Sequence, residues 1–399
     1  MAVSAPATLL GLRWRLWLMT LGHLVIDSNA ALLFALLPLF VNRLHINFAQ
    51  AGALATLLLM TSSVTQPLFG LWQDRHPLFP MSSIGLLVAG LAMGLTGFVT
   101  TYVDMIALVF IAGLGVSAFH PQAVAQAARA SATHQEWGIA VFFTGGSTGT
   151  AIMTLAIVPL ALVFGPHATL VVLIPAAIAA GLFARAYATW LRPAARPPGG
   201  ATAAASVRAV AVPLSMLLVI SILRSAVMTA YLTFLPTLVV VRTGSLGLGA
   251  AALAAFLFAG SVGALLGGVA ARAFGSAPVV VASLITGMAG LLPVPWLPEP
   301  LLVPWMFVAG VLMFASEAQV TALAQRLLPA FIGVASSLMM GVGLGLGNVG
   351  AIITGAVADR SGIQLALTDT TLLMSGAIAA AVVYVLSMRG AQRAPSEGR

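Results

Sequence analysis

Charged side chains, lysine and cysteine are what this sequence has least of. Only 7% of its 399 residues are charged, against about 25% in a typical soluble domain, which excludes a mostly water-exposed surface. Cysteine is absent, which excludes disulfides, thiolate metal sites and cysteine nucleophiles. All 17 basic residues are arginine, scattered singly rather than clustered beside aromatic residues as on a nucleic-acid-binding face. The motifs GxSxG and HExxH and the Walker loop are missing, so nothing indicates an enzyme.

Long apolar segments are what the sequence has in abundance. Hydrophobic residues make up 60% of the chain, and the mean hydropathy is +1.08. A membrane-spanning helix needs about 20 mostly apolar residues. The chain contains twelve such runs, at residues 16–40, 48–71, 80–100, 103–127, 137–160, 167–190, 211–239, 248–271, 277–297, 301–325, 331–357 and 365–388. We therefore predict an all-α integral membrane protein with twelve transmembrane helices.

A polar, Pro- and Gly-rich stretch divides these runs into six and six. We expect an N-terminal six-helix half at residues 1–191, a cytoplasmic linker at 192–209, a C-terminal six-helix half at 210–390 and a cytoplasmic tail at 391–399.

The two halves repeat one another at an offset of about 198 residues. Leu37-Pro38 matches Leu235-Pro236, and His120 matches Glu317 at nearly the same offset. A parallel repeat of two six-helix halves is typical of major facilitator transporters, and it predicts a central cavity between two pseudo-symmetric halves.

Arginine is distributed unevenly between the two sides that the twelve runs define. With both termini in the cytoplasm, the cytoplasmic side holds Arg13, Arg15, Arg75, Arg129, Arg185, Arg192, Arg196, Arg208, Arg272, Arg326, Arg389, Arg393 and Arg399. The outer side holds Arg43, Arg242 and Arg360. Because arginine favours cytoplasmic loops, we predict a multi-pass protein of the bacterial inner (plasma) membrane with both termini cytoplasmic.

Several short motifs are spread over nearly the whole chain. They are Gly22-His23-Leu24-Val25-Ile26-Asp27, Gln66-Pro67, Gly70-Leu71-Trp72-Gln73-Asp74-Arg75, Phe119-His120-Pro121, Gly145-Gly146, Gln325-Arg326-Leu327-Leu328-Pro329 and Ala356-Val357-Ala358-Asp359. This set resembles the fosmidomycin resistance family of the major facilitator superfamily. The resemblance implies proton-driven efflux of a small molecule from the cytoplasm. Three places depart from the family pattern: Gln122 stands where Glu is common, Ser147 stands where Asn is common, and the usual Gly-Pro is missing around Met153-Thr154.

Three formal charges lie well inside predicted helices, away from the helix ends, namely Asp27, Arg224 and Glu317, and they are accompanied by His23 and His120. A charge near the bilayer centre costs several kcal/mol unless it faces a cavity or a partner, which makes it a candidate functional group. These residues lie in the first, fourth, seventh and tenth runs, the first helices of the four three-helix repeats.

Four of these residues are predicted to couple transport to protons: Asp27, His23, Glu317 and His120. His23 and Asp27 are four residues apart, so they share a helix face and can share a proton. The alternative is a buried polar pair that only stabilises its helix. A metal site from these four residues is chemically feasible, but no ligand-rich loop accompanies them, and we predict no metal.

Arg224 keeps its charge in every state, so it needs an anion. Asp27, Glu317 and a substrate carboxylate or phosphonate are the candidates. Uncharged donors and acceptors in the predicted helices complete a substrate-binding set. That set is Arg224, Gln122, Gln319, Asn348 and Gln66.

Gly70, Asp74 and Arg75 stand at the cytoplasmic end of the second predicted helix. Glycine lets a helix end pack closely, and an acid at a helix terminus can pair with a basic residue or with the N-terminus of a facing helix. We predict that these residues form a cytoplasmic gate. The alternative is an arginine that sets topology beside an incidental aspartate.

Together these observations predict a proton-coupled antiporter that exports a small organic compound or drug, such as a phosphonate- or carboxylate-like anion, by alternating access. The alternatives are a proton-coupled importer of an organic acid on the same fold and a non-transporting membrane receptor. The expected partners are a small-molecule substrate, protons and the lipid bilayer, without nucleic acid. We expect a monomer with no cofactor and no catalytic residue.

Overall fold

The computed structural model describes residues 8–9, 12–76, 79–130, 135–190, 210–329, 335 and 337–393. Nearly all of these residues are helical, as apolar segments in hydrocarbon must be, because every backbone N–H and C=O there needs a partner within its own segment. The exception is one antiparallel pair of two-residue strands, in which Thr8 pairs with Arg13 and Leu9 with Leu12.

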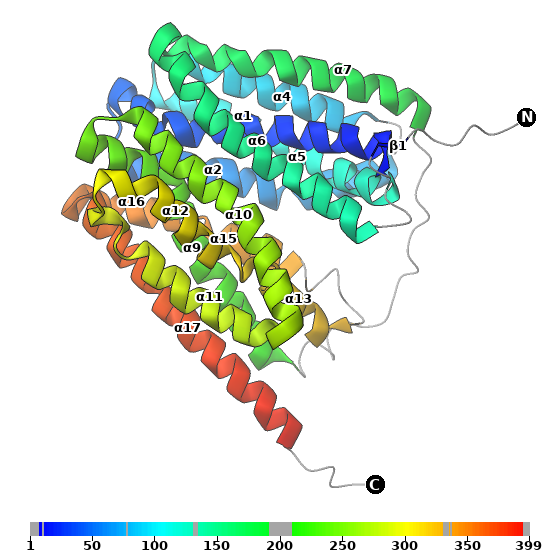
Figure 1. Cartoon of the computed structure of the whole chain (residues 1–399). Coiled ribbons are helices and arrows are strands. Elements are labelled where there is room, and N and C mark those ends of the chain that lie inside the picture. Colours follow the sequence, from blue (N-terminus) through cyan, green and yellow to red (C-terminus); the bar gives the residue numbers. More distant parts are fainter. Residues whose placement is uncertain are drawn as a thin grey trace, which may run out of the picture. The chain divides into compact units, whose positions relative to one another are not determined.

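The elements follow in chain order and are labelled in Figure 1 where there is room; η marks 3₁₀-helices, except η5, which is a π-helix. They are β1 (Thr8–Leu9), β2 (Leu12–Arg13), α1 (Trp14–Leu44), α2 (Phe48–Val64), α3 (Gln66–Arg75), α4 (Met81–Leu95), η1 (Thr96–Phe98), α5 (Tyr102–Ala130), α6 (Gln135–Phe164), η2 (Gly165–Val172), α7 (Leu173–Trp190), α9 (Ala211–Thr243), α10 (Leu246–Phe274), α11 (Ser276–Leu291), η3 (Val294–Trp296), α12 (Glu299–Phe314), α13 (Glu317–Leu327), η5 (Ser337–Gly343), α15 (Leu344–Gly347), α16 (Gly350–Ser361) and α17 (Ile363–Arg393).

Within the described residues, 11 helical segments are long and apolar enough to cross a membrane. One of them, Val141–Ala186, has 46 residues, which at 1.5 Å per residue is more than twice the roughly 30 Å of a bilayer core. The fifth and sixth predicted runs both overlap this segment. It is interrupted by η2, which starts at Gly165 with a φ of 65°. The predicted all-helical membrane fold is confirmed.

Several predicted runs are divided rather than continuous. The run at 48–71 breaks at Thr65, because Pro67 has no N–H to continue the hydrogen-bond ladder of α2. The run at 301–325 breaks just before Glu317, which therefore opens α13. The eleventh run likewise contains the π-helix η5 and a turn before α16. These breaks place polar residues at helix ends within the apolar segments.

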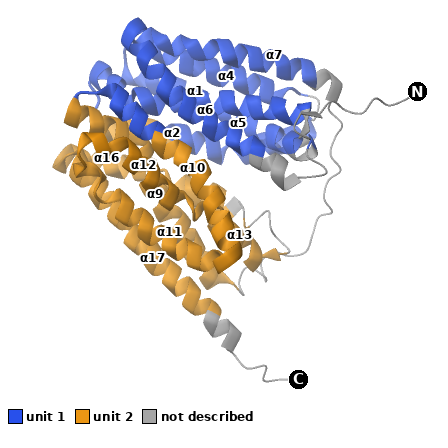
Figure 2. Cartoon of the chain, in the orientation of Figure 1, with its two compact units in different colours: residues 1–46, 57–195, 244–254 blue, residues 47–56, 196–243, 255–399 orange. Residues whose placement is uncertain are grey.

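The chain forms two compact units, coloured blue and orange in Figure 2. Unit 1 comprises Met1–Ile46, Leu57–Ala195 and Gly244–Ala254, and unit 2 comprises Asn47–Thr56, Arg196–Thr243 and Ala255–Arg399. The first turns of α2 thus belong to unit 2. The predicted division into halves at 1–191 and 210–390 stays a prediction.

Unit 1 is organised around α1, which packs against α4, α5, α6 and α7. Its core contains Ile26, Phe119, Phe142 and Phe183, all buried. Large apolar side chains such as Leu162 remain exposed, as expected of a surface that faces lipid.

Unit 2 is organised around α9, which packs against α13, α15, α16, α17 and η5. The buried Tyr231 on α9 donates its hydroxyl to the carbonyl of Leu291 at 2.8 Å, which ties α9 to α11.

The repeat noted in the sequence has a local counterpart in both units. In unit 1, Arg43 donates to the carbonyl of Gly97 at 2.5 Å, and in unit 2 its sequence match Arg242 donates to the carbonyl of Leu297 at 2.6 Å. Each arginine therefore ties the last turn of its helix to the loop before the fourth helix of its own half.

Candidate functional site

A carboxylate between two imidazoles forms a polar cluster in unit 1. His23 Nε2 lies 3.2 Å from Asp27 Oδ2 along α1, and His120 Nε2 on α5 lies 3.7 Å from Asp27 Oδ1. The side chains of His23 and His120 are 4% and 17% exposed, whereas Asp27 is 28% exposed. The structure thus brings together three of the four predicted proton-coupling residues and leaves the carboxylate as the most accessible of the three.

Backbone carbonyls fix the tautomer of both imidazoles. His23 Nδ1 lies 2.8 Å from the carbonyl oxygen of Phe142, and His120 Nδ1 lies 2.8 Å from that of Val116. Because a carbonyl only accepts, each Nδ1 carries the hydrogen, and each Nε2 of a neutral ring presents a lone pair. Lone pairs and carboxylate oxygens repel, so the cluster needs a proton or another cation between them. The His23–Asp27 contact is the shorter of the two and is therefore better suited to share a proton.

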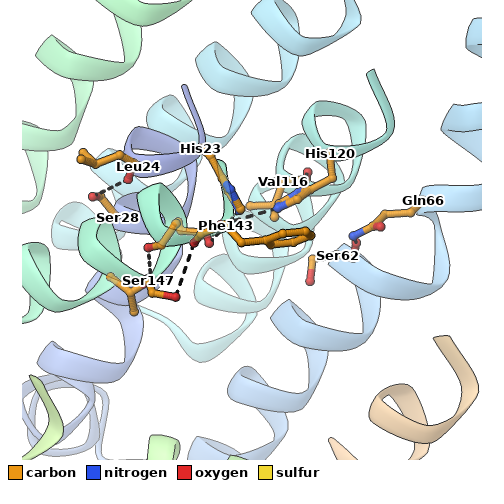
Figure 3. A network of polar contacts seen from close by, with 12 residues as sticks. His23, Leu24, Ser28, Ser62, Gln66, Val116, His120, Phe143 and Ser147 are labelled. Carbon is orange, nitrogen blue, oxygen red and sulfur yellow. Dashed lines mark hydrogen bonds and ion pairs between the residues drawn. The ribbon is translucent and has the colours of Figure 1, made fainter. Parts of the chain in front are cut away.

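Aromatic rings enclose the two histidines. The His23 ring stacks on Phe142 at 4.2 Å between centroids and meets the His120 ring edge to face at 5.1 Å. Phe143 and Phe119 add further edge contacts, at 5.7 Å to His23 and 5.5 Å to His120. Figure 3 shows His23 and His120 side by side with Phe143 next to them. The rings hold the imidazoles in place and limit water access to the side of Asp27.

Glycines on α6 let its backbone approach the cluster. A Cβ added at Gly146 would meet Asp27 Oδ2 and lie 2.6 Å from His23 Nε2. One turn further along, Ser28 donates to the carbonyl of Gly149 at 2.9 Å and to that of Leu24 at 2.7 Å. The motif Gly145-Gly146 in the sequence did not reveal this positioning role of Gly146 and Ser28.

The cluster also has the composition of a cation site. His23, Asp27 and His120 each offer one ligand atom, and these atoms lie within 4.8 Å of one another. Two imidazoles and one carboxylate are a donor set that divalent transition metals accept. The absence of a metal therefore stays a prediction.

The second charged site is in unit 2, where α9 and α13 bring Arg224 and Glu317 together. Arg224 NH2 lies 3.8 Å from Glu317 Oε1, with the arginine side chain 3% and the glutamate side chain 39% exposed. Nε and NH1 of Arg224 have no hydrogen-bond partner among the described residues. Burying a charge with so little compensation is unfavourable, so the site is suited to a further anion. Within unit 2, Glu317 is the predicted anion that Arg224 contacts.

The predicted substrate-binding amides occupy different environments. Gln66 donates to the carbonyl of Ser62 at 2.8 Å and is half-buried. Both residues are labelled in Figure 3. Asn348 is buried and accepts a hydrogen bond from Thr229 at 2.9 Å. Gln319 is buried near the start of α13. Whether these three contact substrate stays a prediction.

Gln122 has a structural task that the sequence did not reveal. Its Oε1 accepts from the backbone N–H of Ser82 at 2.8 Å, and its Nε2 donates to the carbonyl of Phe79 at 3.3 Å. Buried amides satisfied in this way hold the first turn of α4 on α5. Whether Gln122 also contacts substrate stays a prediction.

The predicted cytoplasmic gate is described only in part. A Cβ at Gly70 would lie 3.8 Å from Pro121 Cβ, an ordinary contact, so close packing does not require glycine there, contrary to our expectation. Arg75 is exposed in the last turn of α3. The side chain of Asp74 lies outside the described residues, and the cytoplasmic gate stays a prediction.

Comparison with known proteins places the chain in a family. It is an apolar helical bundle that carries buried charges, and the family model of the Major Facilitator Superfamily matches residues 19–349. The chain belongs to this superfamily: it is a secondary transporter and a multi-pass inner-membrane protein, not an enzyme.

Individual relatives cover most of the chain. The uncharacterised MFS-type transporter YfnC of Bacillus subtilis (strain 168) is 28% identical over 355 residues, covering 86% of this chain and 85% of its own. The fosmidomycin resistance protein of Escherichia coli (strain K12) is 24% identical over 361 residues, covering 87% and 86%. The chain shares its fold with a bacterial homologue of the human lysosomal transporter Spinster, solved in an inward-facing and unoccupied conformation. The TM-score is 0.77 at 14% identity, and the match covers 96% of this chain and 98% of the other.

Proposed function

We propose that the protein is a proton-coupled antiporter that exports a small organic compound or drug by alternating access. The observation that carries this proposal is the Asp27 cluster, in which two imidazole Nε2 atoms face one partly accessible carboxylate within an apolar helix bundle. An ionisable group in such a place is a proton-relay candidate by default. The fosmidomycin resistance protein among the relatives supports efflux as the direction and drug resistance as the outcome.

Proton and substrate exclude one another at Asp27. In the proton-loaded state, one proton lies between His23 Nε2 and Asp27 Oδ2, at the 3.2 Å contact. This proton can move to His120 Nε2, which also faces the carboxylate, and from there to water. A substrate group that donates a hydrogen bond to Asp27 then takes the vacated oxygens. Reprotonation from the outer side releases the substrate, and exchange follows because the carboxylate serves one partner at a time.

Arg224 selects for negative charge. Its guanidinium is buried and permanently charged, and Glu317 compensates it at 3.8 Å through one nitrogen only. A substrate carboxylate or phosphonate fits the two remaining nitrogens, which is why we propose a small anionic compound. Glu317, which is more accessible, is the second acid that we propose to release a proton when substrate binds.

Transport by the full-length protein in vesicles tests the coupling scheme. With fosmidomycin as the probe and an imposed pH gradient, Asp27→Asn and Glu317→Gln should each abolish proton-driven transport. Asp369→Asn, the same chemical change at an exposed position of α17, should leave it unchanged. Intact proton-driven transport in both Asp27→Asn and Glu317→Gln would refute the scheme. A screen of phosphonates, carboxylates and hydrophobic drugs, with and without Arg224→Ala, identifies the substrate class if fosmidomycin is not carried.

Proton-coupled import of an organic acid is the second candidate, and the Arg224–Glu317 pair favours it. Protonating Glu317 frees Arg224 for an anion, so at this pair proton and anion bind together rather than in exchange. Counterflow measured in both inverted and right-side-out vesicles separates the two directions. A non-transporting receptor would be supported instead if Arg224→Ala changed nothing in any uptake or efflux assay.

Oligomeric state, topology and the cytoplasmic gate are properties of the whole chain. We propose that it works as a monomer with both termini in the cytoplasm and with two six-helix halves, and that Gly70, Asp74 and Arg75 close the cytoplasmic side. Light scattering in detergent tests the oligomeric state. Transport in vesicles by the variant Asp74→Asn tests the gate.

A further inference from the structure

Helix α2 begins with a capping box. The side chain of Asn47 accepts from the N–H of Gln50 at 2.8 Å, and the side chain of Gln50 accepts from the N–H of Asn47 at 3.0 Å. The N–H of Ala51 donates to the carbonyl of Asn47 at 3.0 Å. A helix N-terminus leaves its first N–H groups without intrahelical partners. The capping box satisfies those of Asn47 and Gln50 but not those of residues 48 and 49.

A carboxylate from a distant helix takes both of these N–H groups. Asp359, in the last turn of α16, accepts from Phe48 through Oδ1 at 2.8 Å and from Ala49 through Oδ2 at 2.9 Å. A carboxylate at a helix N-terminus is stabilised both by the hydrogen bonds and by the helix dipole. The two residues are more than 300 positions apart in the chain. Asp359 therefore completes the cap of a helix that is far from it in the sequence.

Two glycines bring the backbones of these helices into direct contact. A Cβ added at Gly52 would meet the carbonyl oxygen of Ala351, and one added at Gly355 would meet that of Phe48. Glycine is required at both positions, because a larger residue would force α2 and α16 apart. The contact is thus built by the sequences of both helices, beyond the Asp359 cap alone.

Buried contacts continue from this end toward the middle of the helices. Thr56, two turns into α2, donates to the carbonyl of Asn348 at 2.8 Å. The ring of Phe48 meets that of Phe234 on α9 edge to face at 6.3 Å. All of these residues belong to unit 2. The side chain of Thr56 is buried by this contact and becomes accessible only if α2 separates from α16.

Alternating access requires this contact to break. In the predicted repeat, α2 is the second helix of the N-terminal half and α16 is part of the eleventh helix, in the C-terminal half. Major facilitator transporters work by rocking one half against the other, so a contact made across halves in one state is lost in the next. Asp359 is exposed, and water can replace its bonds to the N–H groups when the helices part.

We propose that Asp359 is a gating residue. Its carboxylate docks on the N-terminus of α2 and holds this end of the two helices closed, and its release opens the face of the membrane at which they lie. Under the predicted orientation this is the outer face. The inference rests on the alternating access of the proposed function, but not on the substrate or on proton coupling.

The contact of Asp359 with the N-terminus of α2 is called the latch here, and the membrane face at which it lies is the latch face. Because the chain has no cysteine, Thr56→Cys introduces a unique thiol behind the latch. The full-length variant is labelled with a membrane-impermeant maleimide, in intact cells for one face and in inverted vesicles for the other. Adding Asp359→Asn, which keeps the shape and removes the charge, should raise the labelling rate from the latch face about two- to fivefold, the effect of a surface charge at a helix N-terminus. The rate from the opposite face should not rise.

Asp104→Asn is the matched control. Asp104 lies in the first turn of α5, at the same predicted membrane face, and its carboxylate bonds locally to Thr101 at 2.7 Å. It should leave the labelling of Thr56→Cys unchanged. Gly355→Ala keeps the carboxylate but inserts a methyl group between the backbones, and it should also raise labelling from the latch face. Unchanged labelling in both Asp359→Asn and Gly355→Ala, or an equal rise from both faces, would overturn the proposal.

Discussion

At the scale of single residues, Gly146 decides how closely α6 approaches the His23–Asp27 pair. A methyl group at this position would occupy the space of Asp27 Oδ2 and His23 Nε2. We predict that Gly146→Ala separates the pair, lowers proton-driven transport at least tenfold and destabilises the protein by about 1–3 kcal/mol, as overpacking does. The measurements are transport in vesicles and thermal unfolding in detergent.

Gly181→Ala on α7 is the control for that change. A Cβ at Gly181 would meet no atom of the described chain within 4 Å, so transport should be unaffected and stability slightly raised. If Gly146→Ala transported protons and substrate like the unmodified protein, Asp27 would not need its contact with His23.

Arg224 and Glu317 should behave as one energetic unit. Glu317→Gln leaves a buried cation without its anion, and we predict a loss of stability of about 1–2 kcal/mol, less than for a fully buried pair because Glu317 is partly exposed. Adding Arg224→Gln should recover part of that loss. Thermal unfolding of the two single variants and the double variant measures the coupling. If the stability losses of the two single variants simply added in the double variant, the two charges would not interact.

At the scale of helices, the turn between α6 and α7 depends on one backbone conformation. Gly165 has a φ of 65°, which an L side chain adopts at a cost of about 1–2 kcal/mol. No described atom lies within 4 Å of a Cβ there, so steric clash does not contribute. We predict that Gly165→Ala lowers the free energy of unfolding by about 1 kcal/mol. Gly247→Ala in α10, equally open but helical, should not lower it, and equal effects would refute the turn's role.

Most of the helical architecture could be predicted because it follows from composition. Apolar runs of 20 residues and the i,i+4 spacing of His23 and Asp27 are properties of the sequence itself, and the repeat pointed to His120 as well. The helix breaks before Pro67 and Glu317 were missed, because the residues around them remain apolar on average. A proline alone does not decide between a kink and a break.

Contacts that use the backbone could not be predicted in the same way. The carbonyls of Phe142 and Val116 hold the two histidines, and every residue type has a carbonyl. Gln122 was expected at a binding site, but its amide satisfies groups at the start of α4, a pairing between segments 40 residues apart. Asp359 was quoted as part of a motif, yet its partner lies more than 300 residues away. Such pairings depend on tertiary structure, which spacing along one helix does not encode.

At the scale of the whole molecule, the number of crossings rests on the 46-residue segment Val141–Ala186. If it crosses the membrane twice, the loop near His167 lies on the same side as the loop near Thr101. If it crosses once, every later loop changes side, and the uneven distribution of arginine that predicts cytoplasmic termini is lost for the second half. The arginine pattern therefore favours two crossings.

Single cysteines in the cysteine-free chain decide between these topologies. His167 and Thr101 are both exposed, and Gly275 lies in the turn between α10 and α11, on the predicted cytoplasmic side. We predict that an impermeant maleimide added to intact cells labels His167→Cys and Thr101→Cys, and that Gly275→Cys is labelled only in inverted vesicles. Labelling of His167→Cys only in inverted vesicles would mean that α6 and α7 cross the membrane once. The proposed orientation of the C-terminal half, with Arg224 on α9, would then be reversed.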